Sequence, residues 1–172
     1  MPSHNITIRN CQLSTPCAAF AIGSEMSGGV YDVRVSNTHM WDSTAGIHIK
    51  TGPGRGGVIR NVSFENITME NCAEGFMMDY STDSAPPDDP THHLNLSAIP
   101  PVYNILARRI NGTGSKTVAK LLGLPHSWIH NVSFEQVHYD GGTWNCTDVL
   151  GTYQDVVPQP CSALRPMVDS PV

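Results

Sequence analysis

A four-residue pattern, repeated along the chain, restricts the fold more than any other feature of the sequence. It consists of Asn or Asp followed by an apolar, a polar and an apolar residue, and it occurs in five segments: Asn5-Ile-Thr-Ile, Asp32-Val-Arg-Val, Asn61-Val-Ser-Phe, Asn104-Ile-Leu-Ala and Asn131-Val-Ser-Phe. The first apolar residues, Ile6, Val33, Val62, Ile105 and Val132, are separated by 27, 29, 43 and 27 positions. We attribute the longest interval to an insertion rich in Pro and Asp, residues 82–101. Such self-similarity predicts a repeat protein.

A second apolar pattern follows the first at a constant distance. Fourteen residues after the first four of those apolar positions stand Phe20, Ile47, Phe76 and Ala119, and sixteen after them stand Ile22, Ile49, Met78 and Leu121. Two apolar positions separated by one residue predict a strand with one buried face. Helical solenoids would show a 3.6-residue period and leucine-rich repeats a leucine pattern, and neither is present. We therefore predict an all-β parallel β-helix of about four to five coils, with one domain at 1–164 and a tail at 165–172.

The residues between the buried positions of this second strand are predicted to point outward. They form two rows along the stack: Ala21, His48, Met77 and Lys120 in the first, and Gly23, Lys50, Asp79 and Leu122 in the second. Because adjacent strands lie about 4.8 Å apart, Lys50 is expected beside Asp79, with His48 on the same face. A continuous exposed strand face suits an extended polymer, whose successive units can contact successive coils. Alternatively, Asp79 neutralises Lys50 in a structural pair that stabilises by less than about 1 kcal/mol.

Composition argues against several kinds of partner. Charged residues make up 15% of the chain, and the net charge of −5 is spread over scattered residues of both signs. No basic stripe suggests nucleic acid, and no amphipathic stretch or apolar run of about 20 residues suggests a membrane. The five cysteines contain no C-x-x-C pair, so a structural zinc site is not expected. We expect neither a metal nor another cofactor.

Seven N-x-[ST] sequons give mild support for secretion. They begin at Asn5, Asn61, Asn66, Asn95, Asn111, Asn131 and Asn145. The chain starts Met1-Pro-Ser-His4 and runs directly into the first repeat, without a basic-then-apolar leader. This leaves two interpretations, an intracellular protein or an N-terminus that is not the natural one.

Several short motifs together resemble one enzyme family. They are Ala21-Ile-Gly-Ser-Glu-Met-Ser-Gly-Gly29, Gly46-Ile-His-Ile-Lys-Thr51, Gly54-Arg-Gly-Gly57, Pro87-Asp-Asp89 with Ala98-Ile-Pro100, Trp144-Asn-Cys146, and Val157-Pro-Gln-Pro-Cys161. Over roughly residues 2 to 164 the chain resembles the polygalacturonases of glycoside hydrolase family 28, especially plant-type members. The resemblance implies a right-handed parallel β-helix, a secreted or cell-wall location, a monomer, and hydrolysis of the α-1,4-galacturonan of pectin with inversion.

The resemblance also implies a set of site residues, and most of them are missing. The family uses three aspartates in N-T-D and D-D motifs, and inverting chemistry needs two carboxyl groups about 6.5–9.5 Å apart. Both motifs would precede the Ile22-Gly-Ser24 segment, and this chain begins about one coil before it. The histidine of the family's G-H-G motif corresponds to Ala18. We therefore assign no catalytic residue.

The substrate-gripping R-I-K motif of the family reads His48-Ile-Lys50 here. Lysine is kept as a point charge, whereas replacing arginine by histidine removes a planar fork for a carboxylate. A family tyrosine corresponds to Tyr80. We predict that His48, Lys50 and Tyr80 bind pectic polysaccharide in a polygalacturonase-like chain that is inactive alone. The alternatives are a non-catalytic pectin-binding or structural module, or a truncated gene product whose unpaired N-terminal edge favours aggregation.

Other motifs have simpler interpretations. Asp88-Asp89 is predicted to be a solvated loop rather than the catalytic pair, His92-His93 a surface loop rather than a metal site, and Gly52–Gly57 a turn rather than a phosphate cradle. Ser24 does not lie in a G-x-S-x-G elbow. Cys146 and Cys161 flank a short loop and are predicted to form a disulfide, with free buried thiols as the alternative. Cys11, Cys17 and Cys72 then leave at least one unpaired thiol.

Overall fold

The computed structural model describes residues 1–24, 26–80 and 98–167, and within those residues it contains strands and no helix. The larger sheet holds β1 (Ser3–Arg9), β2 (Gln12–Ser14), β4 (Val30–Trp41), β6 (Ile59–Glu70), β8 (Val102–Thr113), β10 (Ile129–Tyr139), β12 (Val149–Val157) and β13 (Leu164–Pro166). The smaller sheet holds β3 (Ala18–Ile22), β5 (Ala45–Lys50), β7 (Glu74–Asp79), β9 (Thr117–Leu122) and β11 (Thr143–Thr147). The described part therefore offers no helix long and apolar enough to cross a membrane.

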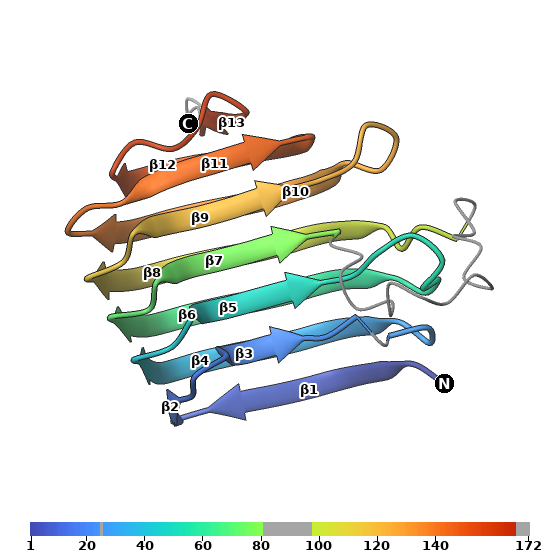
Figure 1. Cartoon of the computed structure of the whole chain (residues 1–172), viewed down its shortest axis with the longest axis horizontal. Helices are drawn as coiled ribbons and strands as arrows, with labels where there is room; N and C mark the ends of the chain where they lie inside the picture. The colour runs from blue at the N-terminus through green and yellow to red at the C-terminus, as the bar shows by residue number, and fades with distance from the viewer. Residues whose placement is uncertain (25, 81–97, 168–172) are drawn as a thin grey trace, which may run out of the picture.

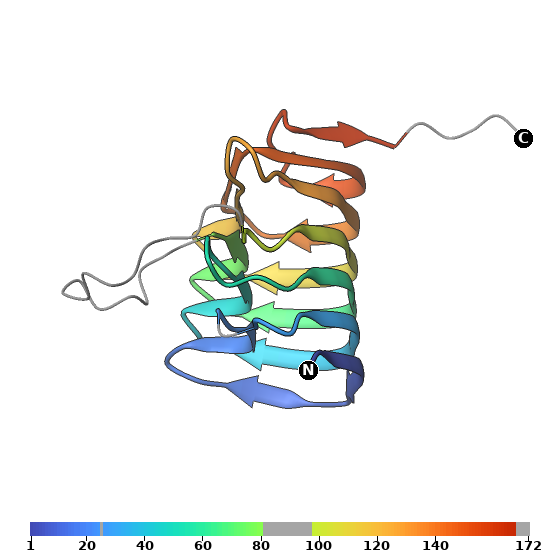
Figure 2. The ribbon, with the colours of Figure 1, turned by 90° about the vertical axis from the view of Figure 1, so that its right-hand side faces the viewer.

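The chain winds between the two sheets. From β4 to β11, each long strand of the larger sheet is followed by a short strand of the smaller one, and every strand pair is parallel. The larger sheet has the order β1-β4-β6-β8-β10-β12-β13 and the smaller one the order β3-β5-β7-β9-β11, so each turn of the chain stacks on the one before. Figures 1 and 2 show this stack with β1 and β13 at opposite ends. The predicted parallel β-helix is confirmed.

The sequence repeat and the strand register coincide. Val62 lies opposite Val33 on one side and Ile105 on the other, and Ile105 in turn lies opposite Val132. These side chains are buried, as are their partners two residues on, and they point between the two sheets. A column of rings fills the middle of the core: Phe20, Phe64, Phe76, Phe134 and Trp144 make edge-to-face contacts at 5.3, 6.3, 5.4 and 5.0 Å between centroids. Such contacts add to the stabilisation from burial.

The structure explains why the repeated pattern begins with Asn or Asp. Asp32, Asn61, Asn104 and Asn131 have φ between 53° and 58°, the left-handed region that Asn and Asp tolerate better than other side chains. Each bends its strand in the larger sheet. Their side chains also bond from coil to coil: Nδ2 of Asn61, Asn104 and Asn131 donates to Oδ1 of the preceding member at 2.8, 2.9 and 2.6 Å. We call this row the first asparagine ladder.

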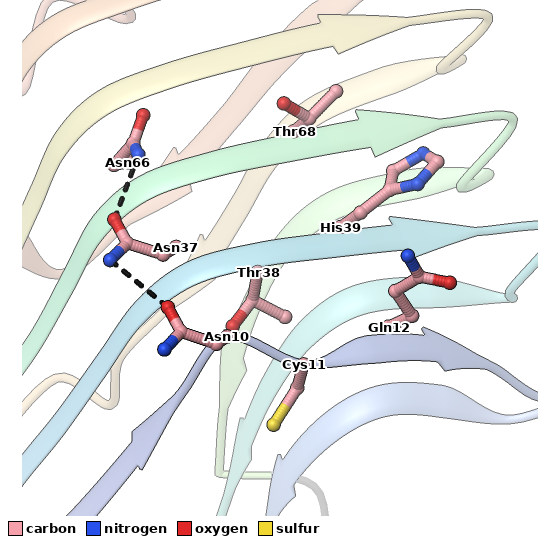
Figure 3. A pocket seen from close by; sticks show the side chains of 8 residues that line it. All are labelled: Asn10, Cys11, Gln12, Asn37, Thr38, His39, Asn66 and Thr68. Carbon is pink, nitrogen blue, oxygen red and sulfur yellow. Dashed lines mark hydrogen bonds between the residues drawn. The ribbon is translucent and has the colours of Figure 1, made fainter.

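A second asparagine ladder runs beside the first. In it, Asn37 Nδ2 donates to Asn10 Oδ1 at 3.3 Å and Asn66 Nδ2 donates to Asn37 Oδ1 at 2.8 Å (Figure 3). All three residues have positive φ. The bonds of both ladders join adjacent coils of the larger sheet at residues with left-handed backbone conformation.

The two ends of the stack differ. At the C-terminal end, a disulfide joins Cys146 of β11 to Cys161, with 6.2 Å between their Cα atoms, and Leu164 of β13 is buried. β13 spans the predicted boundary between domain and tail.

At the N-terminal end, an apolar cavity of about 310 Å³ opens between β1 and β3, lined in part by Ile6, Ile8 and Phe20. The predicted insertion lies mostly outside the described residues.

The three free cysteines are expected to react very differently with iodoacetamide. Cys17 is exposed and Cys11 half-buried, whereas Cys72 is completely buried and its pKa is raised by burial. Because the thiolate is the nucleophile, both access and ionisation disfavour Cys72. At pH 8 without reductant, peptide mapping should find label on Cys17 and Cys11 long before Cys72, and denaturant should remove the difference. Labelling of native Cys72 as fast as Cys17 would contradict this placement.

Candidate functional site

The outward face of the smaller sheet carries the two rows that the sequence predicts. In the first row His48 lies opposite Met77, which lies opposite Lys120, and in the second Lys50 lies opposite Asp79, which lies opposite Leu122. These strands stand side by side in Figure 1 as β5, β7 and β9. The predicted register of this face is therefore confirmed.

These rows line a pocket of about 380 Å³. Its lining residues are His48, Lys50, Met77, Asp79, Tyr80, Lys120, Leu122, Gly123 and Leu124, and we call it the strand-face pocket. It brings together the three residues predicted to bind substrate. The pocket also includes Lys120, which the sequence analysis does not predict as a binding residue. The position of Lys120 in the outward row is the signal that could have identified it. Two lysines and one carboxylate give the lining an excess of positive charge.

Among the described residues that line the pocket, His48 forms a polar contact with Asp79. His48 Nε2 lies 3.2 Å from Asp79 Oδ2, and the side chains are 20% and 5% exposed. Strand register alone suggested Lys50 as the partner of Asp79, because those two residues are opposite each other. A buried carboxylate beside an imidazole holds the ring in one orientation. No ion pair joins Lys50 to Asp79 within the described residues.

Tyr80 belongs to the wall of the pocket rather than to its open surface. It is only 5% exposed, and burial raises the pKa of its hydroxyl above the ordinary value. The hydroxyl donates to the Pro100 carbonyl oxygen at 3.0 Å and accepts from Ser127 Oγ at 3.3 Å. Tyr80 thereby joins the segment that returns from the insertion to the loop between β9 and β10. Both bonds hold these loops at the rim of the pocket.

The remaining motifs of the sequence do not line the strand-face pocket. Gly52–Gly57 connects β5 to β6 as a turn in which the amides of Gly54 and Gly56 donate to the Ala98 carbonyl oxygen. Ser24 is buried. Asp88-Asp89 and His92-His93 lie outside the described residues. Among the described residues, no group of three or more His, Cys, Asp or Glu side chains is placed to hold a metal ion.

A second polar pocket lies on the outer face of the larger sheet. It has a volume of about 380 Å³ and is lined by Asn10, Cys11, Gln12, Asn37, Thr38, His39, Asn66 and Thr68 (Figure 3). Its lining includes no lysine or arginine, and three of its amides already bond to one another in the second asparagine ladder. The strand-face pocket is the better candidate site, because its lining contains two cationic side chains, Lys50 and Lys120.

Residues 2–158 match the family model described as Glycosyl hydrolases family 28. The chain belongs to glycosyl hydrolase family 28. A probable polygalacturonase of Vitis vinifera is 33% identical over 171 residues, which cover 95% of this chain and 34% of that relative. An endo-polygalacturonase of Pectobacterium carotovorum subsp. carotovorum is 34% identical over 77 residues, 45% of this chain and 19% of the relative.

A solved structure shows the same fold. The hyperthermoactive exopolygalacturonase from Thermotoga maritima superposes with a TM-score of 0.77 at 20% identity, covering 91% of this chain and 34% of that one. This family 28 chain thus spans about a third of the length of the Vitis vinifera relative and of the Thermotoga maritima enzyme.

Proposed function

We propose that the strand-face pocket binds pectic galacturonan through the carboxylates of its sugar units. The observation that supports this most is the presence of Lys50 and Lys120 on one face, with Asp79 buried against His48. Strands β5 and β9 are separated by β7, so the two lysines stand about two strand spacings, roughly 10 Å, apart along the stack. A polyuronate chain lying along the coils presents a carboxylate on each unit and can meet both cations.

The three residues predicted to bind substrate take different roles in this proposal. Lys50 contacts a carboxylate as a point charge. His48, whose Nε2 faces Asp79, accepts a hydrogen bond from a sugar hydroxyl through its other ring nitrogen. Tyr80 is a positioning residue, because its hydroxyl already bonds to Pro100 and Ser127. Lys120 supplies a second cation further along the polymer.

We further propose that the complete activity is that of a polygalacturonase acting outside the cell or in the cell wall. The names of the relatives support the activity, since they are polygalacturonases of plant, fungal and bacterial origin. Hydrolysis needs a general acid and a general base. The N-T-D motif does not occur in this sequence, and its D-D pair, Asp88-Asp89, falls within the predicted insertion. The chain by itself therefore binds the polymer, as a monomer, without cleaving it.

The binding proposal is tested by replacing Lys50 with Ala. Removing one charge-assisted contact should weaken the affinity for polygalacturonate about tenfold in isothermal titration calorimetry. Lys116→Ala is the matched control, because Lys116 is an exposed lysine that does not line the pocket. Added salt and methyl-esterification of the polymer should both weaken binding to the unchanged protein.

Two results would contradict the proposal. Equal losses for Lys50→Ala and Lys116→Ala would mean that binding depends on overall charge and not on the pocket. Undiminished affinity for fully esterified pectin would mean that carboxylates are not what the site recognises.

A further inference from the structure

The sequons of this chain fall into two structural classes. Six of the seven lie in the described residues, and four of these six begin at an Asn with positive φ: Asn5, Asn61, Asn66 and Asn131. Asn111 and Asn145 are not among the positive-φ residues. The distinction matters because N-glycosylation occurs at the Nδ2 atom of the sequon Asn, and that same atom is the donor in both asparagine ladders.

In three of the positive-φ sequons, the Asn Nδ2 atom already donates a hydrogen bond within an asparagine ladder. Asn61 Nδ2 lies 2.8 Å from Asp32 Oδ1, Asn66 Nδ2 lies 2.8 Å from Asn37 Oδ1, and Asn131 Nδ2 lies 2.6 Å from Asn104 Oδ1. Each bond spans two adjacent coils. A sugar on Nδ2 would replace one of its two hydrogens and place a ring at an atom that already bonds to the adjacent coil. A chain carrying a glycan there would have to give up stacking at that position.

Asn111 and Asn145 have open surroundings. Asn111 is an exposed residue of β8 between buried Ile110 and buried Gly112, so its side chain points away from the core. Asn145 is an exposed residue of β11, the edge strand of the smaller sheet, and its neighbour Trp144 packs inward against Phe134. No bond between coils uses either side chain within the described residues.

We propose that Asn111 and Asn145 are the N-glycan acceptors of this chain, and that Asn61, Asn66 and Asn131 stay unmodified in the folded protein. The donor is a lipid-linked oligosaccharide pyrophosphate of the secretory pathway. A bond forms between sugar C1 and Nδ2, the bond between C1 and the pyrophosphate oxygen breaks, and the proton lost from Nδ2 passes to solvent while the lipid pyrophosphate leaves. Asn5 has no preceding ladder member and Asn95 is not described, so the proposal concerns the other five sequons.

The proposed acceptor at Asn145 bears on the strand-face pocket. Asn145 lies opposite Lys120 in the register of β11 with β9, which makes it the next member of the outward row that contains His48 and Lys120. A glycan there would stand at the end of the proposed polymer path and limit how far a chain extends past Lys120. This second part rests on the proposed function, whereas the assignment of the acceptors does not.

Site-by-site occupancy decides the assignment. The full chain is secreted from a eukaryotic cell line behind a cleaved leader, and the soluble, folded fraction is deglycosylated with PNGase F in ¹⁸O water and mapped by mass spectrometry. We expect label at Asn111 and Asn145, and none at Asn61, Asn66 or Asn131. Occupancy at any of these three, or an empty Asn111 or Asn145, would overturn the assignment for that site.

Sequon variants provide the controls without altering an Asn. Thr113→Ala and Thr147→Ala should each remove one glycan, whereas Ser63→Ala and Ser133→Ala should leave the glycan mass unchanged. If Thr147→Ala removes the glycan but leaves affinity for long polygalacturonate unchanged, the proposed limit on the polymer path is wrong and the acceptor assignment stands. If binding is absent from every variant and from the unchanged protein, the proposed function fails instead.

Discussion

Replacing Phe76 with Ala is expected to lower the free energy of unfolding by about 3–5 kcal/mol, the usual cost of removing a fully buried aromatic ring. Phe76 is completely buried and stands in the middle of the core column, with Phe64 and Phe134 making edge-to-face contacts on either side. In a stack of coils, stability depends on the interfaces between neighbours. One substitution at this position weakens two of them. Urea unfolding followed by circular dichroism measures the change.

Met77→Ala is the matched control for Phe76→Ala. Met77 is the next residue of the same strand and lies on the outward face, between His48 and Lys120. Its replacement should cost less than about 1 kcal/mol, because little buried contact is lost. Similar decreases in the free energy of unfolding for the two variants would contradict two claims: that the ring column stabilises the core, and that Phe76 faces inward and Met77 outward.

The fold could be predicted from the sequence because its repeat has two independent components. The spacing of Ile6, Val33 and Val62 fixes the coil length, and the period-two pattern of the second strand fixes which residues face inward. In a solenoid these local patterns determine the long-range pairs, since each coil contacts only its neighbours. Asn or Asp marks the start of each pattern in the sequence, whereas the two roles of that residue, a left-handed backbone conformation and a bond between coils, follow only from the structure.

The candidate site was harder to predict, because side-chain contacts do not follow from strand register. Register places Lys50 opposite Asp79, yet the contact of 3.2 Å is made by His48 from the adjacent row. The bonds of Tyr80 to Pro100 and Ser127 depend on how the loops return from the insertion and from β9, and no periodic pattern describes loops. Lys120 could have been included from the outward row alone.

The purified chain is expected to release no reducing sugar from polygalacturonate above the uncatalysed background. A general acid or base contributes about 10²- to 10⁴-fold each, and inverting hydrolysis needs two carboxyl groups about 6.5–9.5 Å apart. Asp79, the carboxylate of the strand-face pocket, is buried against His48, and the pocket lining contains no other Asp or Glu to complete such a pair. Reducing-end assays over several hours, with a full-length polygalacturonase as the positive control, measure the difference.

Joining coils to the N-terminal end distinguishes a partial enzyme from a binding module. The coils of a family 28 polygalacturonase that carry the N-T-D and D-D motifs are fused before Met1, so that the last of them stacks on β1 and β3 and covers the apolar cavity there. If the strand-face pocket is the substrate-gripping part of a hydrolase, the fusion should gain turnover, and Lys50→Ala within it should reduce kcat/KM about tenfold, as expected for one lost charge-assisted contact. A folded fusion that binds polygalacturonate without turnover would favour the non-catalytic module. Turnover by the 172-residue chain alone would refute the proposal that the chain by itself does not cleave the polymer.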